Sequence, residues 1–225
     1  MQNVALFNYK KLVLLFISIF IAPAIFAPSI NYALENAPGH EVVWFYLKLG
    51  FSHIIPSGLD HILFVMGLCL LSSKVKTILW QATAFTVAHS ITLAMSMKNI
   101  IVAPSAIVEP IIALSILFVA VENILLSELK PWRIAIVFLF GLIHGMGFAS
   151  ALNEIGLPNG KFYTSIIAFN AGVELGQIAV ITAMFSLIII PLRNKVWYRK
   201  KIVFGLSACI GLVAAFWTVE RIFLQ

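Results

Sequence analysis

Charged residues are scarce in this sequence. Only 11% of its 225 residues are Asp, Glu, Lys or Arg, whereas 61% are hydrophobic. Soluble domains carry about a quarter charged residues, so this composition excludes an ordinary soluble domain and predicts the lipid bilayer as a partner. A spanning helix needs about 20 apolar residues, which leaves room for roughly six or seven spans joined by short loops.

Cysteine is scarce too. Cys69 and Cys209 both lie inside apolar runs, and the chain has no CxxC pair, so neither a disulfide framework nor a cysteine zinc site is expected. The net charge of +6 does not indicate nucleic acid, because the basic residues lie between apolar runs rather than on one face. No GxSxG or nucleotide-binding motif is present, and we assign no catalytic and no cofactor-binding residue.

Residues 1–27 have the pattern of a secretory signal peptide. Two lysines precede an apolar stretch over 12–21, and small residues up to Ala27 offer a cleavage site. The alternative is an uncleaved N-terminal helix. We favour cleavage because Pro23 and Pro28 shorten the apolar run.

Residues 28–225 are predicted to form a single all-α integral membrane domain, a polytopic bundle of six transmembrane helices. Only a helix satisfies all its own backbone hydrogen bonds in hydrocarbon. A short interfacial helix is expected over 41–54, where aromatic residues surround Lys48. The predicted spans are 55–73, 77–97, 101–125, 133–153, 163–191 and 202–220.

The basic residues orient this bundle. If the end of the signal peptide is external, nine basic residues fall in cytoplasmic loops and four in external segments. The nine are Lys74, Lys76, Lys130, Arg133, Arg193, Lys195, Arg199, Lys200 and Lys201, and the four are Lys48, Lys98, Lys161 and Arg221. The bias predicts a multi-pass protein of the bacterial inner (cytoplasmic) membrane, with both ends of the mature chain outside.

Ionisable side chains recur inside the predicted spans. Each costs about 2.5–3.5 kcal/mol at a helix centre on insertion scales, so a single one is often a hydrogen bond between helices, but several together indicate a shared polar task. With a rise of about 1.5 Å per residue, all except Glu122 lie between the midplane and the external mouth. The residues are Asp60, His61, His89, Glu109, Glu122, His144 and Glu174.

Two helical patterns support one shared site. Asn170, Glu174 and Gln177 recur at i, i+4 and i+7, which places them on one stripe. Gly141 and Gly145 form a GxxxG step, which lets another helix approach closely, although packing alone would also explain these glycines.

Imidazole and carboxylate groups without a thiolate pair suit a divalent metal ion. Nickel, zinc, iron, cobalt and manganese all accept such ligands, and the sequence leaves the identity open. Asp60 and His61 are neighbours on one helix and diverge by about 100°, so one can ligate while the other orients a partner.

Five ordered motifs resemble the HupE/UreJ family of integral membrane proteins. They are GLDHILF (58–64), FTVAHSITL (85–93), VEPIIALS (108–115), FGLIHGMGF (140–148) and FNAGVELGQ (169–177). The resemblance implies a signal-bearing, six-helix protein, and the hydrogenase- and urease-linked members are regarded as nickel permeases. It also implies that the metal pathway includes His53, Asp60, His61, His144 and Glu174.

The chain resembles the second, less characterised branch of this family more closely. Hydrogenase-linked members have five residues between the first histidine and the Asp-His pair, whereas six separate His53 from Asp60 here. Those members also carry a second histidine soon after the fourth-helix His-Gly, where this chain has Gly147 and Phe148.

We therefore predict a divalent metal permease with a buried site, nickel being one candidate. The alternative is an intramembrane metalloenzyme acting on a lipid or membrane-embedded substrate, and a b-type haem carrier or a scaffold is less favoured. The sequence does not fix the oligomeric state. The predicted metal-site residues are His53, Asp60, His61, His89, Glu109, His144, Asn170 and Glu174.

The orientation can be tested by cysteine labelling in a background where Cys69 and Cys209 are serine. Single cysteines at positions 128 and 197 should react with a membrane-impermeant maleimide only after the cells are permeabilised. A cysteine at position 98 should react in intact cells. External labelling at either of the first two positions would overturn the predicted topology.

Overall fold

The computed structural model describes residues 34–224. This part of the chain is helical with short connections and contains no strand, which confirms the predicted all-α fold. The predicted signal peptide, residues 1–27, lies outside the described residues.

Five helical segments of the described chain are long and apolar enough to span a membrane, and one bent helix pair raises the number to six. The five segments are α5 (Val75–Met97), α6 (Ser105–Leu125), α7 (Arg133–Gly147) with α8 (Ala149–Ile155), α9 (Phe162–Met184) with the π-helix η2 (Phe185–Ile189) and α10 (Ile190–Leu192), and the π-helix η3 (Tyr198–Val203) with α11 (Phe204–Phe223). A 3-10 turn, η1 (Asn159–Lys161), precedes α9.

The first span differs from the prediction. Helix α4 (Leu59–Leu70) has 12 residues, about 18 Å at 1.5 Å per residue, and is too short to cross the bilayer alone. It meets the span criteria only together with α3 (Gly39–Ile54), and the two are bent by 68°. The predicted interfacial helix over 41–54 is therefore half of a broken segment, and a separate span over 55–73 is wrong.

Sequence explains where this segment breaks. Pro56 has no N–H to donate, so the hydrogen-bond ladder of α3 cannot continue through it. The chain then turns so tightly that a Cβ atom at Gly58 would overlap the carbonyl oxygen of His53. The turn places His53, at the end of α3, against His61 in the first turns of α4.

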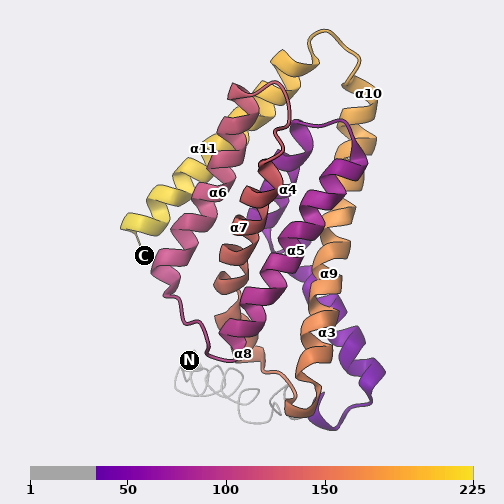
Figure 1. The fold of residues 1–225 in the computed structure, drawn as a ribbon, viewed down its shortest axis with the longest axis vertical. Coiled ribbons are helices and arrows are strands. Elements are labelled where there is room, and N and C mark those ends of the chain that lie inside the picture. The colour runs from indigo at the N-terminus through magenta and orange to yellow at the C-terminus, as the bar shows by residue number, and fades with distance from the viewer. Residues whose placement is uncertain (1–33, 225) are drawn as a thin grey trace, which may run out of the picture.

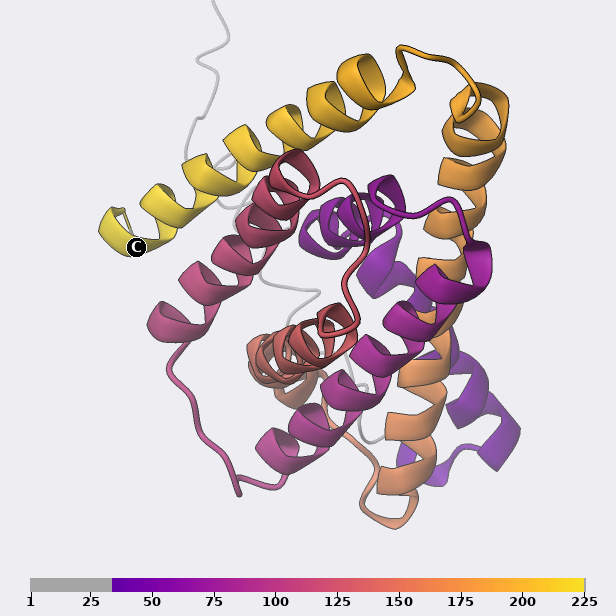
Figure 2. The same ribbon diagram turned by 45° about the horizontal axis from the view of Figure 1, so that its top comes forward.

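The helices associate in three extensive pairs, with α4 between them. Helix α3 packs on α9, α5 on α7 and α6 on α11, while α4 contacts members of all three pairs. Figure 1 shows the long helices running in roughly one direction, and Figure 2 shows α6 and α11 on the opposite side of the bundle from α3 and α9.

Glycines bring backbones into direct contact in two of these pairs. A Cβ atom at Gly141 would overlap the carbonyl oxygen of Phe85, and one at Gly145 would overlap that of His89. This confirms the close approach expected at the GxxxG step, and α5 is the helix that approaches.

The packing of α3 on α9 uses the same device, which the sequence analysis did not identify. A Cβ atom at Gly50 would overlap the carbonyl oxygen of Phe169, and one at Gly172 would overlap that of Leu47. These glycines allow the backbones of α3 and α9 to lie in direct contact.

Replacing Gly172 with alanine should destabilise the protein by about 1–3 kcal/mol, because the added methyl group has no space against α3. The matched control is Gly205→Ala in α11, where nothing lies within 4 Å of the added atom. That change should alter stability by no more than about 1 kcal/mol, in the favourable direction. Thermal unfolding in detergent measures both, and equal melting temperatures would contradict the packing argument.

Candidate metal site

Three histidines from three helices converge inside the bundle. His53 ends α3, His61 lies in α4 and His89 in α5, and one ligand nitrogen from each lies within 4.8 Å of the other two. His61 and His89 are buried. The Nε2 atom of each of the three is buried and has no hydrogen-bond partner.

The size of this triangle suits one metal ion after a small adjustment. An equilateral triangle with 4.8 Å sides has its centre about 2.8 Å from each corner, whereas nitrogen ligands bind zinc at about 2.0–2.1 Å. Each ring therefore has to move by less than about 1 Å to reach a shared ion. The ring centroids of His53 and His61 are 4.7 Å apart, and those of His61 and His89 are 5.9 Å apart.

Asn170 fixes which nitrogen of His89 can bind a metal. Its Nδ2 donates to the carbonyl oxygen of Ile166 at 2.8 Å, so its Oδ1 faces His89 Nδ1 at 3.1 Å. An amide oxygen only accepts, hence Nδ1 of His89 carries the proton and Nε2 keeps its lone pair. Asn170 was predicted as a metal-site residue, and the structure places it behind His89 as the group that orients the imidazole.

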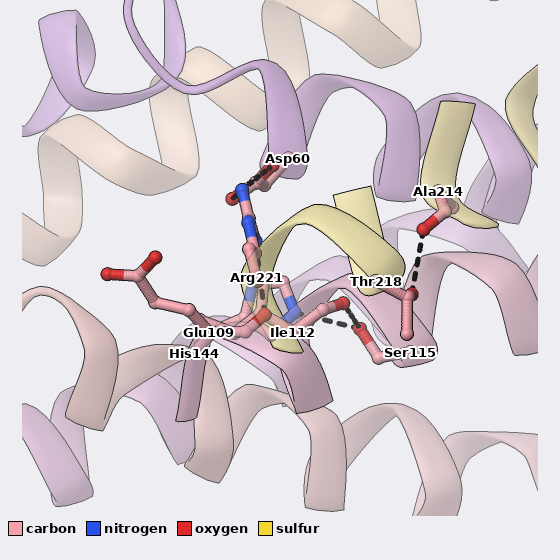
Figure 3. A network of polar contacts seen from close by, with 8 residues as sticks. All are labelled: Asp60, Glu109, Ile112, Ser115, His144, Ala214, Thr218 and Arg221. Carbon is pink, nitrogen blue, oxygen red and sulfur yellow. Dashed lines mark hydrogen bonds and ion pairs between the residues drawn. The ribbon is translucent and has the colours of Figure 1, made fainter. Parts of the chain in front are cut away.

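A fourth histidine is held in the opposite tautomer. Ser115 Oγ donates to the carbonyl oxygen of Ile112 at 2.7 Å, so it must accept from His144 Nε2 at 2.9 Å (Figure 3). The lone pair of His144 is then on Nδ1, which is buried and has no hydrogen-bond partner. The His144 ring centroid lies 5.0 Å from that of His61, which places this histidine beside the cluster.

The histidine cluster adjoins a cavity of about 420 Å³. Its walls come from the break between α3 and α4, the first turns of α4 and α6, and the last turns of α7 and α11. This is the end of the bundle that the basic-residue bias assigns to the outside. The lining residues include His53, Asp60, His61, Glu109, His144, Phe148, Trp217 and Arg221.

Asp60 is engaged by a cation in this cavity. Arg221 Nη2 donates to both carboxylate oxygens of Asp60, at 3.0 and 3.1 Å, and Arg221 Nη1 donates to the carbonyl oxygen of Glu109 at 3.1 Å (Figure 3). Asp60 was predicted as a metal-site residue, and Arg221 as an external topology determinant. The structure pairs these two side chains, and Glu109 lines the same cavity. A metal role of Asp60 stays a prediction.

Glu174 lies apart from the histidine group. Its Oε1 accepts a hydrogen bond from Thr83 Oγ1 at 2.7 Å, and Gln177 Oε1 accepts one from Thr86 Oγ1 at 3.0 Å. The predicted stripe of α9 does face α5. Thr83 is six residues before His89, about 9 Å along the helix, so Glu174 lies on the side of the cluster that the basic-residue bias assigns to the cytoplasm.

A second ion pair is buried at the other end of the bundle. Arg133 Nη1 lies 3.1 Å from Glu122 Oε2, and both side chains are almost fully buried. Asn123 accepts from Arg133 at 3.3 Å and donates to the carbonyl oxygen of Gly67 at 2.8 Å. Arg133 was counted as a cytoplasmic loop charge, and that assignment is wrong because the side chain is an internal partner of Glu122.

Sequence reasoning missed Ser115, Arg133 and Arg221 as parts of the polar interior. Ser115 ends the VEPIIALS motif, seven residues after Val108 and on the same helical face, so the motif itself held a signal. The two arginines stand near the ends of apolar runs, where nothing in the local sequence distinguishes an internal partner from a loop charge.

These features define a class, a multi-pass α-helical membrane protein with a buried histidine cluster. A model of the HupE/UreJ family, described as HupE / UreJ protein, matches residues 30–221. The chain therefore belongs to the HupE/UreJ family, a membrane family related to nickel and cobalt transport. A search of curated proteins found no match. A search of solved structures found none either.

Asn170→Ala should weaken metal binding by roughly 10–100-fold, because His89 loses the partner that fixes its tautomer and ring orientation. Gln81→Ala is the matched control, since Gln81 is also a buried amide that donates to a backbone carbonyl, that of Thr77, but lies eight residues before His89 on α5. Calorimetric titration of the purified variants with Ni²⁺ or Co²⁺ measures both, and the control should stay within about threefold of wild type. Equal losses in both variants would refute the orienting role.

Proposed function

We propose that this protein is a permease for a divalent metal ion in the bacterial inner membrane. One observation supports it above the others: three histidines converge beside a cavity at one end of the bundle, and each has a buried Nε2 atom without a hydrogen-bond partner. Leaving such atoms unpaired in hydrocarbon costs free energy, and a metal ion removes that cost by taking their lone pairs.

The ligand set favours exchange over permanent retention. Among the described residues, the three-histidine group contains no carboxylate, so the ligands do not neutralise the charge of a divalent ion. Structural zinc sites close four ligands around the ion, whereas three histidines beside a cavity leave positions for water. Neutral nitrogen ligands accept nickel, zinc, iron or cobalt, and the family makes nickel and cobalt the first ions to test.

Polar groups continue inward from the cluster. The pairs Thr86–Gln177 and Thr83–Glu174 follow the His89–Asn170 pair between α5 and α9. They offer oxygen ligands on the cytoplasmic side of the histidines, which an ion in transit needs and a closed enzyme pocket does not.

An intramembrane metalloenzyme is the second candidate. Three protein ligands and an open position also describe catalytic zinc sites, and Glu109 lines the cavity where a general base would act on a metal-bound water. The family relationship and the inward polar groups favour transport.

The proposed function also includes the processing, membrane orientation and family branch of the chain. We infer that residues 1–27 are a signal peptide and that residues 28–225 form one membrane domain with the cavity open to the outside. We also assign the chain to the second branch of the family, on the spacing of His53 and Asp60 and on Gly147 and Phe148 after the fourth-helix motif.

Transport can be tested in proteoliposomes that enclose a metal-sensitive dye. Wild-type protein should accelerate Ni²⁺ or Co²⁺ entry, and His61→Ala should reduce the rate at least tenfold, because it removes one of three converging ligands. His40→Ala is the control, since His40 is exposed at the start of α3 and lies away from the cluster.

The same preparations separate the two candidates. Metal bound by wild type and lost in His61→Ala, without any flux in either, would reject the permease and favour the metalloenzyme. Flux that is equal in wild type, His61→Ala and His40→Ala would show that the histidine cluster is not on the pathway.

A further inference from the structure

A positive charge lines the cavity that we propose for a cation. Arg221 is on α11, near the end of the described chain, and its side chain is 16% exposed. Asp60 and Glu109 are the acidic groups on the same lining, so the arginine neutralises part of the attraction that the cavity has for metal ions. A fixed arginine in a cavity proposed for metal cations therefore calls for an explanation.

Arg221 is attached at three points, and only one of them is a carboxylate. Its Nη2 donates to both carboxylate oxygens of Asp60, and its Nη1 donates to the carbonyl oxygen of Glu109 (Figure 3). Its guanidinium also lies over the Trp217 ring, 5.4 Å from the ring centroid. The side chain can therefore release Asp60 and keep the carbonyl and the indole as partners.

Asp60 is well placed to receive a metal ion when it is released. It precedes His61 directly in α4, and both residues line the cavity. A carboxylate prefers the cation with the higher charge at a given distance, because the Coulomb energy scales with the product of the charges. A divalent ion can compete with the tethered guanidinium for this carboxylate. A monovalent ion has the same charge as the guanidinium and therefore has no Coulomb advantage over it.

We propose that Arg221 is a specificity-determining residue, a tethered monovalent cation that occupies Asp60 until a divalent ion displaces it. The inference rests on the proposed function, because it assumes that metal ions enter this cavity. The exchange moves no proton and no electron. The carboxylate leaves the guanidinium and binds the incoming ion, and Arg221 stays on the Glu109 carbonyl and Trp217.

The test is a double-mutant cycle read by Ni²⁺ and Co²⁺ titration of purified protein. Arg221→Gln should tighten divalent binding at least tenfold. Na⁺ at about 0.5 M should weaken divalent binding by Arg221→Gln and leave divalent binding by wild type unchanged. In the Asp60→Asn background, Arg221→Gln should change the logarithm of the affinity by no more than about half as much as it does in wild type. The reason is that the carboxylate which Arg221→Gln would release is then absent. Arg193→Gln, at the opposite end of the bundle, is the matched control and should leave the affinity unchanged.

A second measurement uses the unmodified protein, in case Arg221→Gln does not fold. Hydrogen exchange of the peptide over 215–224 should become faster when Ni²⁺ is added, since the ion breaks the bridge from α11 to α4. Exchange that is unchanged or slower would overturn the proposal.

The outcomes distinguish the two hypotheses. Wild-type protein that binds metal, with an Arg221→Gln affinity equal to or weaker than wild type, overturns only the role of Arg221. Failure of both wild type and Arg221→Gln to bind any divalent ion overturns the proposed function as well.

Discussion

The candidate site depends on direct backbone contact between helices at glycines. Gly50 precedes His53 by three residues in α3, Gly172 follows Asn170 by two in α9, and Gly145 follows His144 in α7. At each glycine the neighbouring helix presents a carbonyl oxygen where a Cβ atom would lie, and at Gly145 that oxygen belongs to His89. In hydrocarbon no hydrophobic force drives helices together, so close packing at small residues sets their separation. The glycines that hold the bundle together therefore also set the distances between the imidazoles.

Hydrogen bonding around the histidines then decides which lone pairs remain available. Asn170 and Ser115 each have a second bond to a backbone carbonyl, and that second bond leaves one orientation toward the neighbouring imidazole. Both tautomers follow from local helical geometry, since Asn170 bonds a carbonyl one turn back and Ser115 a carbonyl three residues back. The result is a set of unprotonated nitrogens that face inward, an arrangement that metal binding requires and helix packing alone does not.

The sequence predicts the helices of this site and their inward faces better than it predicts which side chains pair with one another. The spacing of Asn170, Glu174 and Gln177 in α9 correctly predicts that they face one neighbouring helix, which is α5. Such a stripe follows from the 3.6 residues per turn of an α-helix. The 68° break before α4 was missed, because the aromatic residues of 41–54 are as typical of an interfacial helix as of a buried half-span. Arg133 and Arg221 were counted as loop charges for a related reason. A charge near a span end is consistent with either a loop or an internal ion pair, and only the tertiary structure brings Glu122 and Asp60 to them.

The two ion pairs give the membrane interior a simple electrostatic order. Asp60–Arg221 lies beside the cavity at one end, and Glu122–Arg133 is buried among α4, α6 and α7 toward the other. The histidine cluster lies between them, and its ligands in the neutral form carry no net charge. A buried charge is tolerated only with a partner, and the carboxylates of Asp60 and Glu122 each have an arginine partner. A divalent ion held by neutral imidazoles is itself an unpaired charge, and the Asp60 carboxylate would lower its energy once Arg221 releases it. In the permease that we propose, the cost of burying charge therefore favours an ion that moves inward from the histidines toward Glu174 over one that stays among them.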